Sequence, residues 1–113
     1  MCEFTVILSE DGREDKVAED IVRTTYQNGE LVLMDILGDR ISVGGALITE
    51  VNVDSEVLRI LRDEILRSFI KFLETYEKCK ESGVYDDELK KAWEVVKSTG
   101  DSLIKELALG KNK

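Results

Sequence analysis

The sequence contains no histidine and no proline, and its only cysteines are Cys2 and Cys79. Without histidine, the usual Ser-His-Asp and Cys-His nucleophile pairs and His-rich zinc sites are impossible. The two cysteines are too far apart in the sequence for a Cys-x-x-Cys pair, and they do not form the cysteine pattern of a secreted disulfide framework. We therefore predict a cytoplasmic protein with reduced thiols that is not an enzyme.

Long apolar runs are also missing. No stretch approaches the roughly 18 apolar residues of a membrane span, so we expect no membrane insertion. The first residues lack a basic region followed by an apolar stretch, so we expect no signal peptide.

Charge is distributed unevenly along the 113 residues. Residues 1–56 carry thirteen acidic and four basic side chains, for a net charge of −9, whereas residues 57–113 carry eleven acidic and twelve basic, for +1. Nucleic-acid affinity rests largely on Lys and Arg contacts with phosphate. The first half therefore argues against general DNA or RNA binding, while a local basic patch on the second half stays open.

The first 55 or so residues alternate in the manner of short β-strands. The strand-like runs are EFTVILS, IVRTTYQ, ELVLMDI, RISVGG and ALITEVNV. Asn28-Gly29 joins two of them and is typical of a type I′ hairpin turn. Five or six short strands favour a small closed or nearly closed antiparallel barrel, with Gly44 and Gly45 bending a strand at a corner. The acidic run EDGREDKVAED does not match a calcium loop, and we interpret it as a solvated turn.

The pattern becomes helical near Asp54-Ser55. Apolar residues then recur at intervals of three and four, from Leu58 through Leu61, Ile65, Phe69, Phe72 and Tyr76 to Cys79. Gly83 is expected to end this first helix, and Asp86, Asp87 and Glu88 to begin a second, which Gly100 would break or kink. Residues 57–60 fit either a last strand or the first helical turn. The overall prediction is an α+β protein in which a helical hairpin follows the barrel.

The two thiols have different settings. Cys79 lies on the apolar stripe of the first helix, which favours a buried structural role, and Trp93 is likewise expected in a core or an interface. Cys2 precedes the first strand, where either an incidental small residue or a functional thiol fits.

Residues 1–60 resemble the CooT-type nickel-binding accessory proteins, a family earlier catalogued as predicted RNA-binding proteins. The likeness rests on MCEFTVIL, YQNGELVLMDILGD and GGALITEVNVDSEVLRI. It implies a small SH3-like barrel over residues 1–60, a homodimer, nickel bound through the cysteine after the initiator Met, and a nickel-enzyme client such as carbon monoxide dehydrogenase. Only Cys2 matches that ligand position, and residues 61–113 form a helical extension outside the family pattern.

The resemblance gives Cys2 a specific chemistry. Ni²⁺ takes a square-planar set of nitrogen and sulfur donors. The Cys2 thiolate and its own backbone nitrogen would close a five-membered chelate ring, so a two-fold dimer would supply four donors without histidine. The alternative is a metal-free protein-interaction module, with RNA binding as a minor variant that the acidic first half disfavours.

Overall fold

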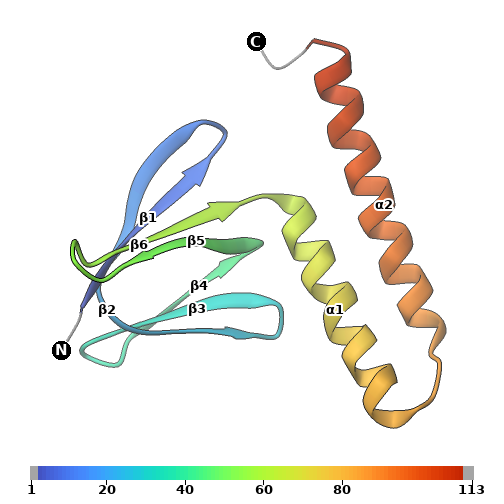
Figure 1. The fold of residues 1–113 in the computed structure, drawn as a ribbon, viewed down its shortest axis with the longest axis horizontal. Coiled ribbons are helices and arrows are strands. Elements are labelled where there is room, and N and C mark those ends of the chain that lie inside the picture. The colour runs from blue at the N-terminus through green and yellow to red at the C-terminus, as the bar shows by residue number, and fades with distance from the viewer. Residues whose placement is uncertain (1–2, 111–113) are drawn as a thin grey trace.

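The structure is a computed structural model that describes residues 3–110, and it confirms the predicted α+β arrangement (Figure 1). Six strands precede two helices. The elements are β1 (Phe4–Glu10), β2 (Arg13–Gln27), β3 (Glu30–Asp35), β4 (Arg40–Gly44), β5 (Ala46–Asn52), β6 (Val57–Arg62), α1 (Glu64–Ser82) and α2 (Asp87–Ala108).

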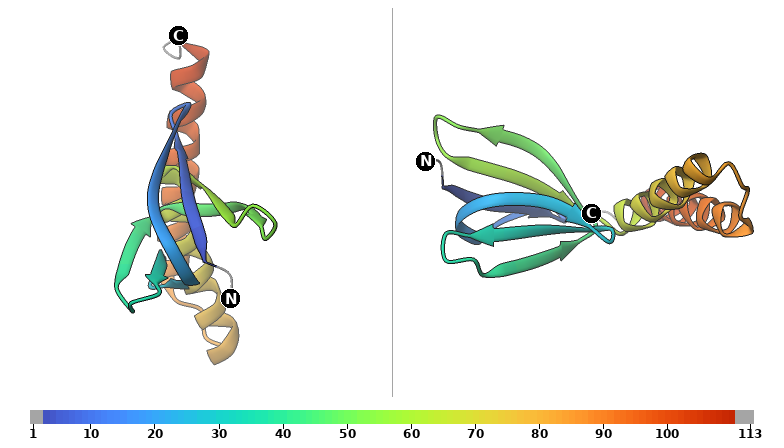
Figure 2. Two further views of the ribbon diagram at one scale, coloured as in Figure 1. Left: turned by 90° about the vertical axis from the view of Figure 1, so that its left-hand side faces the viewer. Right: turned by 90° about the horizontal axis from the view of Figure 1, so that it is seen from below.

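The strands form one curled sheet in the order β4-β3-β2-β1-β6-β5. Every neighbouring pair is antiparallel except β1 and β6, which are parallel, so the sheet is mixed. β4 and β5 are its two edges, and the curl makes a half-barrel rather than a closed one (Figure 2). The Tyr26 hydroxyl of β2 donates a 2.8 Å hydrogen bond to the Ala46 carbonyl of β5, which ties the two sides of the curl together.

The core lies inside the curl, where alternate residues of the strands point inward. Its largest fully buried side chains are those of Ile21, Leu31, Leu33, Ile60 and Val6. The same cluster includes Leu8, Val43, Ala46 and Leu58. The period-2 pattern of the first half therefore encodes the single buried face of this sheet.

The predicted turn residues behave as their chemistry requires. Asn28 and Gly29 have φ values of 52° and 78°, and Asp11 and Gly12 have 54° and 77°. Positive φ at both central residues is the signature of a type I′ turn, whose twist matches that of the flanking strands. Gly45, at φ 68°, makes the corner between β4 and β5, as predicted.

One sequence interpretation needs correction, and one open alternative is decided by the structure. The acidic run is a turn only at Asp11-Gly12, and from Arg13 onward it is the first half of the long strand β2. Pairing with β1 explains this, because Glu10 opposes Arg13 and Leu8 opposes Asp15. Residues 57–60 are strand, and the helix begins only at Glu64. Parallel pairing with β1 places Leu58 beside Val6 in the core.

Capping residues define both helices. The Asp63 carboxylate accepts a hydrogen bond from Ile65 N (3.1 Å), and the Asp86 carboxylate accepts one from Glu88 N (2.9 Å). Gly83 ends α1 in the left-handed conformation (φ 71°), as its sequence position predicted. Gly100 does not interrupt α2, which is helical from Asp87 to Ala108. Neither helix of the described chain is long and apolar enough to span a membrane.

The helices form an antiparallel hairpin that extends away from one end of the sheet (Figures 1 and 2). Its seam has heptad spacing, with half-buried or buried residues Ile65, Ser68, Phe72, Thr75 and Cys79 on α1, and Leu89, Ala92, Val96, Thr99 and Leu103 on α2. The Phe72 and Trp93 rings pack with centroids 5.4 Å apart. Cys79 is half-buried rather than buried, and Trp93 is 43% exposed, because small seam residues bring the helices together without covering their flanks.

Candidate functional site

The residue singled out by sequence, Cys2, lies outside the described residues, so the site is built from what surrounds the beginning of β1. Phe4 begins this strand at the end of the sheet opposite the helices (Figure 1). The same end holds the β3–β4 turn (residues 36–39) and the β5–β6 turn (residues 53–56). We call this end the N-terminal pole.

Backbone hydrogen bonds fix the pole. Thr5 N donates to Glu56 O (2.9 Å), which joins β1 to the β5–β6 turn. Ile36 N donates to Asp20 O (2.9 Å), which joins the β3–β4 turn to a bend in β2, where Asp20 has φ 59°. The Asp35 carboxylate accepts hydrogen bonds from Leu37 N and Asp39 N, both at 2.9 Å. The pole is thus a hydrogen-bonded platform around the beginning of β1.

Exposed apolar side chains lie on this platform. They are Ile36, Leu37, Val51 and Val53, of which Leu37 is 83% exposed. Ile36 and Leu37 belong to the β3–β4 turn, and Val51 and Val53 to the end of β5 and the β5–β6 turn, so these side chains lie at the two edges of the curled sheet. Exposed apolar surface of this kind suits a protein–protein contact. The turn holds Leu37 through its backbone N–H, which donates to the Asp35 carboxylate, so the conformation of the turn does not depend on the Leu37 side chain.

The described residues offer no ready-made multidentate metal site. In the part of the chain from residue 3 to residue 110, no three Asp, Glu or Cys side chains are grouped so that they could share one metal ion. Cys79, the other thiol, lies near the end of α1 in the helical hairpin, whereas β1 begins at the opposite side of the sheet. Cys79 and the N-terminal pole therefore lie in different parts of the molecule, at opposite ends of the sheet.

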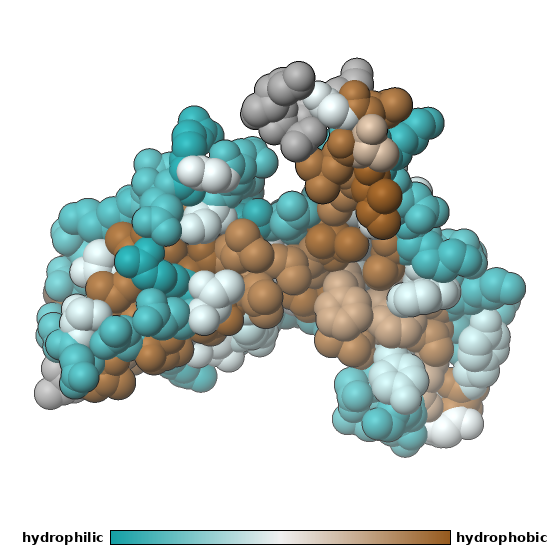
Figure 3. Space-filling model, turned by 45° about the horizontal axis from the view of Figure 1, so that its top comes forward, coloured by the Kyte–Doolittle hydropathy of each residue, from teal (hydrophilic) through white to brown (hydrophobic). Residues whose placement is uncertain are grey.

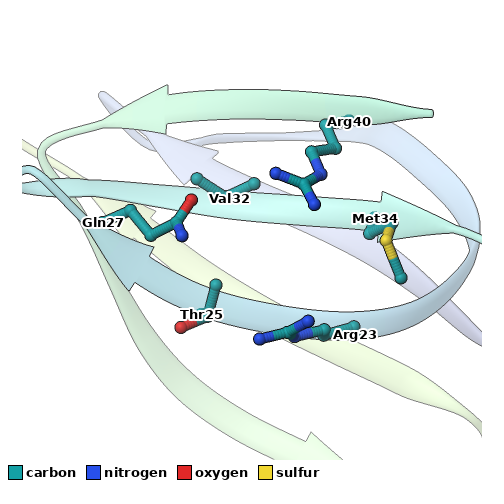
Figure 4. A pocket seen from close by; sticks show the side chains of 6 residues that line it. All are labelled: Arg23, Thr25, Gln27, Val32, Met34 and Arg40. Carbon is teal, nitrogen blue, oxygen red and sulfur yellow. The ribbon is translucent and has the colours of Figure 1, made fainter. Parts of the chain in front are cut away.

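A second feature is a shallow hollow on the outer face of the sheet (Figure 4). Arg23, Thr25 and Gln27 of β2, Val32 and Met34 of β3, and Arg40 of β4 line it. The strand registers place Arg23 opposite Met34 and Met34 opposite Arg40, so one cross-strand row carries two of the four basic residues of the acidic first half. The row was not predictable from the sequence, because the pairing of strands brings these residues together and their order along the chain does not.

The fold and the pole together define a small α+β protein in which a helical hairpin is appended to a curled β-sheet. The chain belongs to the CooT family: the model described as "CO dehydrogenase accessory protein CooT" matches residues 1–60. This match includes Cys2 and β1–β5, and it ends within β6. The family is described as one of CO dehydrogenase accessory proteins, which supports an accessory role for this chain.

A solved structure agrees on the fold. It is described as "putative CooT from Carboxydothermus hydrogenoformans", and it aligns with a TM-score of 0.51 at 19% sequence identity. The alignment covers 56% of the present chain and all of the other. No curated protein matches the sequence. The family likeness therefore concerns the sheet, and the helical hairpin extends beyond it.

Proposed function

We propose that the protein is a dimeric nickel-handling accessory protein, which carries Ni²⁺ as cargo between the Cys2 residues of two copies and delivers it to a nickel enzyme. The observation that carries this proposal is the family match over residues 1–60, which includes Cys2. The accessory role towards CO dehydrogenase belongs to the family description, and nickel, the dimer and the Cys2 ligand are our additions.

Donor chemistry supports the choice of metal. Nickel accepts a square-planar set of nitrogen and sulfur ligands. A Cys2 thiolate and the Cys2 backbone nitrogen provide one donor of each kind per chain, so two chains complete the set around a two-fold axis. The sequence has no histidine to provide an imidazole ligand. Thiolate binding also makes the affinity fall as the pH falls, because protons compete for the sulfur.

The N-terminal pole offers a surface for the required dimer. Cys2 stands two residues before Phe4, which begins β1 at the pole, and the exposed side chains of Ile36, Leu37 and Val53 belong to the same end of the sheet. A contact between two such poles would bury apolar surface and bring the two chain starts towards one axis.

A nickel titration of the reduced full-length protein tests the proposal. We expect thiolate-to-nickel charge-transfer absorption that saturates at one Ni²⁺ per two chains. Cys2→Ser should abolish this absorption, whereas Cys79→Ser, the matched control, should titrate like the wild type. Nickel binding to Cys2→Ser at wild-type affinity would refute the assignment.

The apolar pole has its own test. Leu37→Glu should weaken nickel binding by disfavouring the pole-to-pole contact, while circular dichroism and thermal unfolding stay close to those of the wild type, because Leu37 is exposed. Unchanged nickel affinity in Leu37→Glu would remove the pole from the dimer model and leave the Cys2 assignment standing.

A metal-free interaction module is the second candidate function. The exposed aromatic residues Phe69, Tyr76 and Trp93 of the hairpin favour it, because they lie outside the matched residues 1–60. The same titration distinguishes the two functions: a protein that binds no nickel in its reduced state would leave the interaction module as the better description.

A further inference from the structure

The helical hairpin has an incomplete core. Its helices are 19 and 22 residues long, yet within them as described Ala92 alone is buried. The seam between them relies on small residues such as Ser68, Thr75 and Thr99. Helices in folded proteins gain most of their stability from packing an apolar face, and this hairpin leaves much of its apolar surface unpacked.

That unused surface forms a second stripe on α2, beside the seam. Trp93, Gly100, Ile104 and Leu107 follow one another at intervals of seven, four and three residues, which places them on one side of the helix. Trp93 is 43% exposed, Ile104 68% and Leu107 61%. Figure 3 shows apolar surface that runs over the helices to the C-terminal end of α2.

Half of this stripe lies beyond the reach of α1. Gly100 lies against Ile65, the second residue of α1. The helices are antiparallel, so α2 continues for about two more turns beyond the N-terminal end of α1. Figure 1 shows this overhang at the top of α2. Ile104 and Leu107 are on it, in a position that α1 cannot cover.

Gly100, at the centre of the stripe, also points to a contact on this side of α2. Glycine in a helix interior lowers helix stability relative to alanine. Gly100 has no positive φ that would require it, and a Cβ atom there would lie 3.6 Å from Ile65 Cδ1, which is an ordinary van der Waals contact. Nothing within the described chain therefore requires glycine at the centre of the exposed stripe. The close approach of a helix from a second molecule would account for a glycine at this position, because small residues let two helix backbones approach closely.

The charged residues beside the stripe identify the occupant. Glu94, Lys97, Asp101 and Lys105 lie along the flank of α2 that faces away from α1. In an antiparallel pair of α2 helices centred near Gly100, Glu94 meets Lys105 of the other copy, and Lys97 meets Asp101. The midpoints of both opposite-charge pairs lie within one residue of Gly100, and within one copy Glu94 and Lys97 also form an ion pair of 3.6 Å. The flank is therefore complementary to itself in one orientation.

We infer that α2 packs antiparallel against α2 of a second copy of this chain, around a two-fold axis near Gly100. In this arrangement Trp93 of one copy covers the overhanging Ile104 and Leu107 of the other, and the two hairpins complete a four-helix core. The contact lies at the opposite end of the molecule from the N-terminal pole, so it neither needs nickel nor replaces the pole-to-pole contact. Both contacts together would give a dimer of dimers.

Sedimentation equilibrium of the reduced, metal-free protein tests the contact. The double variant Ile104→Glu/Leu107→Glu should halve the mass of the assembly and raise the dissociation constant of this contact at least 100-fold, with helix content unchanged. Val95→Glu is the matched control, because Val95 is an exposed apolar residue on the opposite side of α2. It should keep the wild-type mass. Equal masses for the double variant and the wild type would overturn the inference.

A charge exchange tests the orientation without touching apolar packing. Glu94→Lys should weaken association, because the introduced ammonium group would face Lys105 of the second copy, and Glu94→Lys/Lys105→Glu should restore it. Failure of the double exchange to restore association would refute the antiparallel register. Cys2→Ser should leave this contact unchanged, so the nickel proposal and the hairpin inference can fail separately.

Discussion

The corner between β4 and β5 determines where the hairpin begins, and two adjacent glycines there respond differently to the same change. The Gly45 carbonyl accepts a 3.0 Å hydrogen bond from Asp63 N, the N-cap residue of α1. A Cβ at Gly45 would lie 2.8 Å from the Asp63 carbonyl oxygen, and the backbone has φ 68°. A Cβ at Gly44 would instead meet the guanidinium of Arg67, which is the movable end of a flexible side chain.

We expect Gly45→Ala to lower the free energy of unfolding by about 1.5–3.5 kcal/mol. The left-handed conformation costs an L-residue about 1–2 kcal/mol, and displacing Asp63 forfeits a backbone hydrogen bond worth about 0.5–1.5 kcal/mol. Gly44→Ala should cost less than about 1 kcal/mol, because it disturbs only the exposed 3.6 Å Arg67–Glu30 ion pair.

Urea unfolding followed by circular dichroism measures both variants. The two should share the wild-type slope, with the midpoint shifted mainly in Gly45→Ala. Equal destabilisation by the two variants, or a larger loss in Gly44→Ala, would refute the claim that Gly45 fixes the junction between the sheet and α1.

Three further predictions concern stability. Leu33→Ala should lower the free energy of unfolding by about 2–5 kcal/mol in urea, since Leu33 is fully buried and its removal leaves a cavity. Asp63→Ala should cost about 1 kcal/mol by the same measurement, whereas Asp63→Asn should cost less, because an amide oxygen still caps Ile65 N. Tyr26→Phe should lower the free energy of unfolding by about 1 kcal/mol, and with it the thermal midpoint, because the hydrogen bond to Ala46 across the curl is lost. An unchanged midpoint would mean that this hydrogen bond does not stabilise the curled sheet.

Local chemistry made much of the fold predictable. Asn28-Gly29 requires positive φ at two residues, Gly83 suits a helix end, and Asp86 is a capping residue, so each position was recognisable from its neighbours alone. The change from a period of two to a period of 3.6 separated sheet from helices. Its exact position was not predictable, because residues 57–60 fit either pattern until β1 pairs with them.

The errors have one physical origin. Arg13–Asp20 reads as a solvated turn because it is charged, yet pairing with β1 makes it a strand whose side chains mostly face water. Cys79 reads as a buried residue because it lies on an apolar stripe, but it is only half-buried, since the stripe contains more apolar surface than two helices in one chain can bury. Trp93, predicted in a core or an interface, is 43% exposed within the chain, so the interface remains a prediction.

The sequence by itself determined the α+β class, most of the turns and the helix boundaries at Gly83 and Asp86, because each depends on residues close together along the chain, whereas Cys2 as the candidate ligand came from the family resemblance of residues 1–60. Only the tertiary structure decided which ends and faces meet. It joined β1 to β6 in parallel, assembled the N-terminal pole from turns far apart in sequence, and left the stripe around Gly100 uncovered. These outcomes depend on long-range strand pairing and on how much apolar surface one chain can bury, and neither is encoded in any short segment.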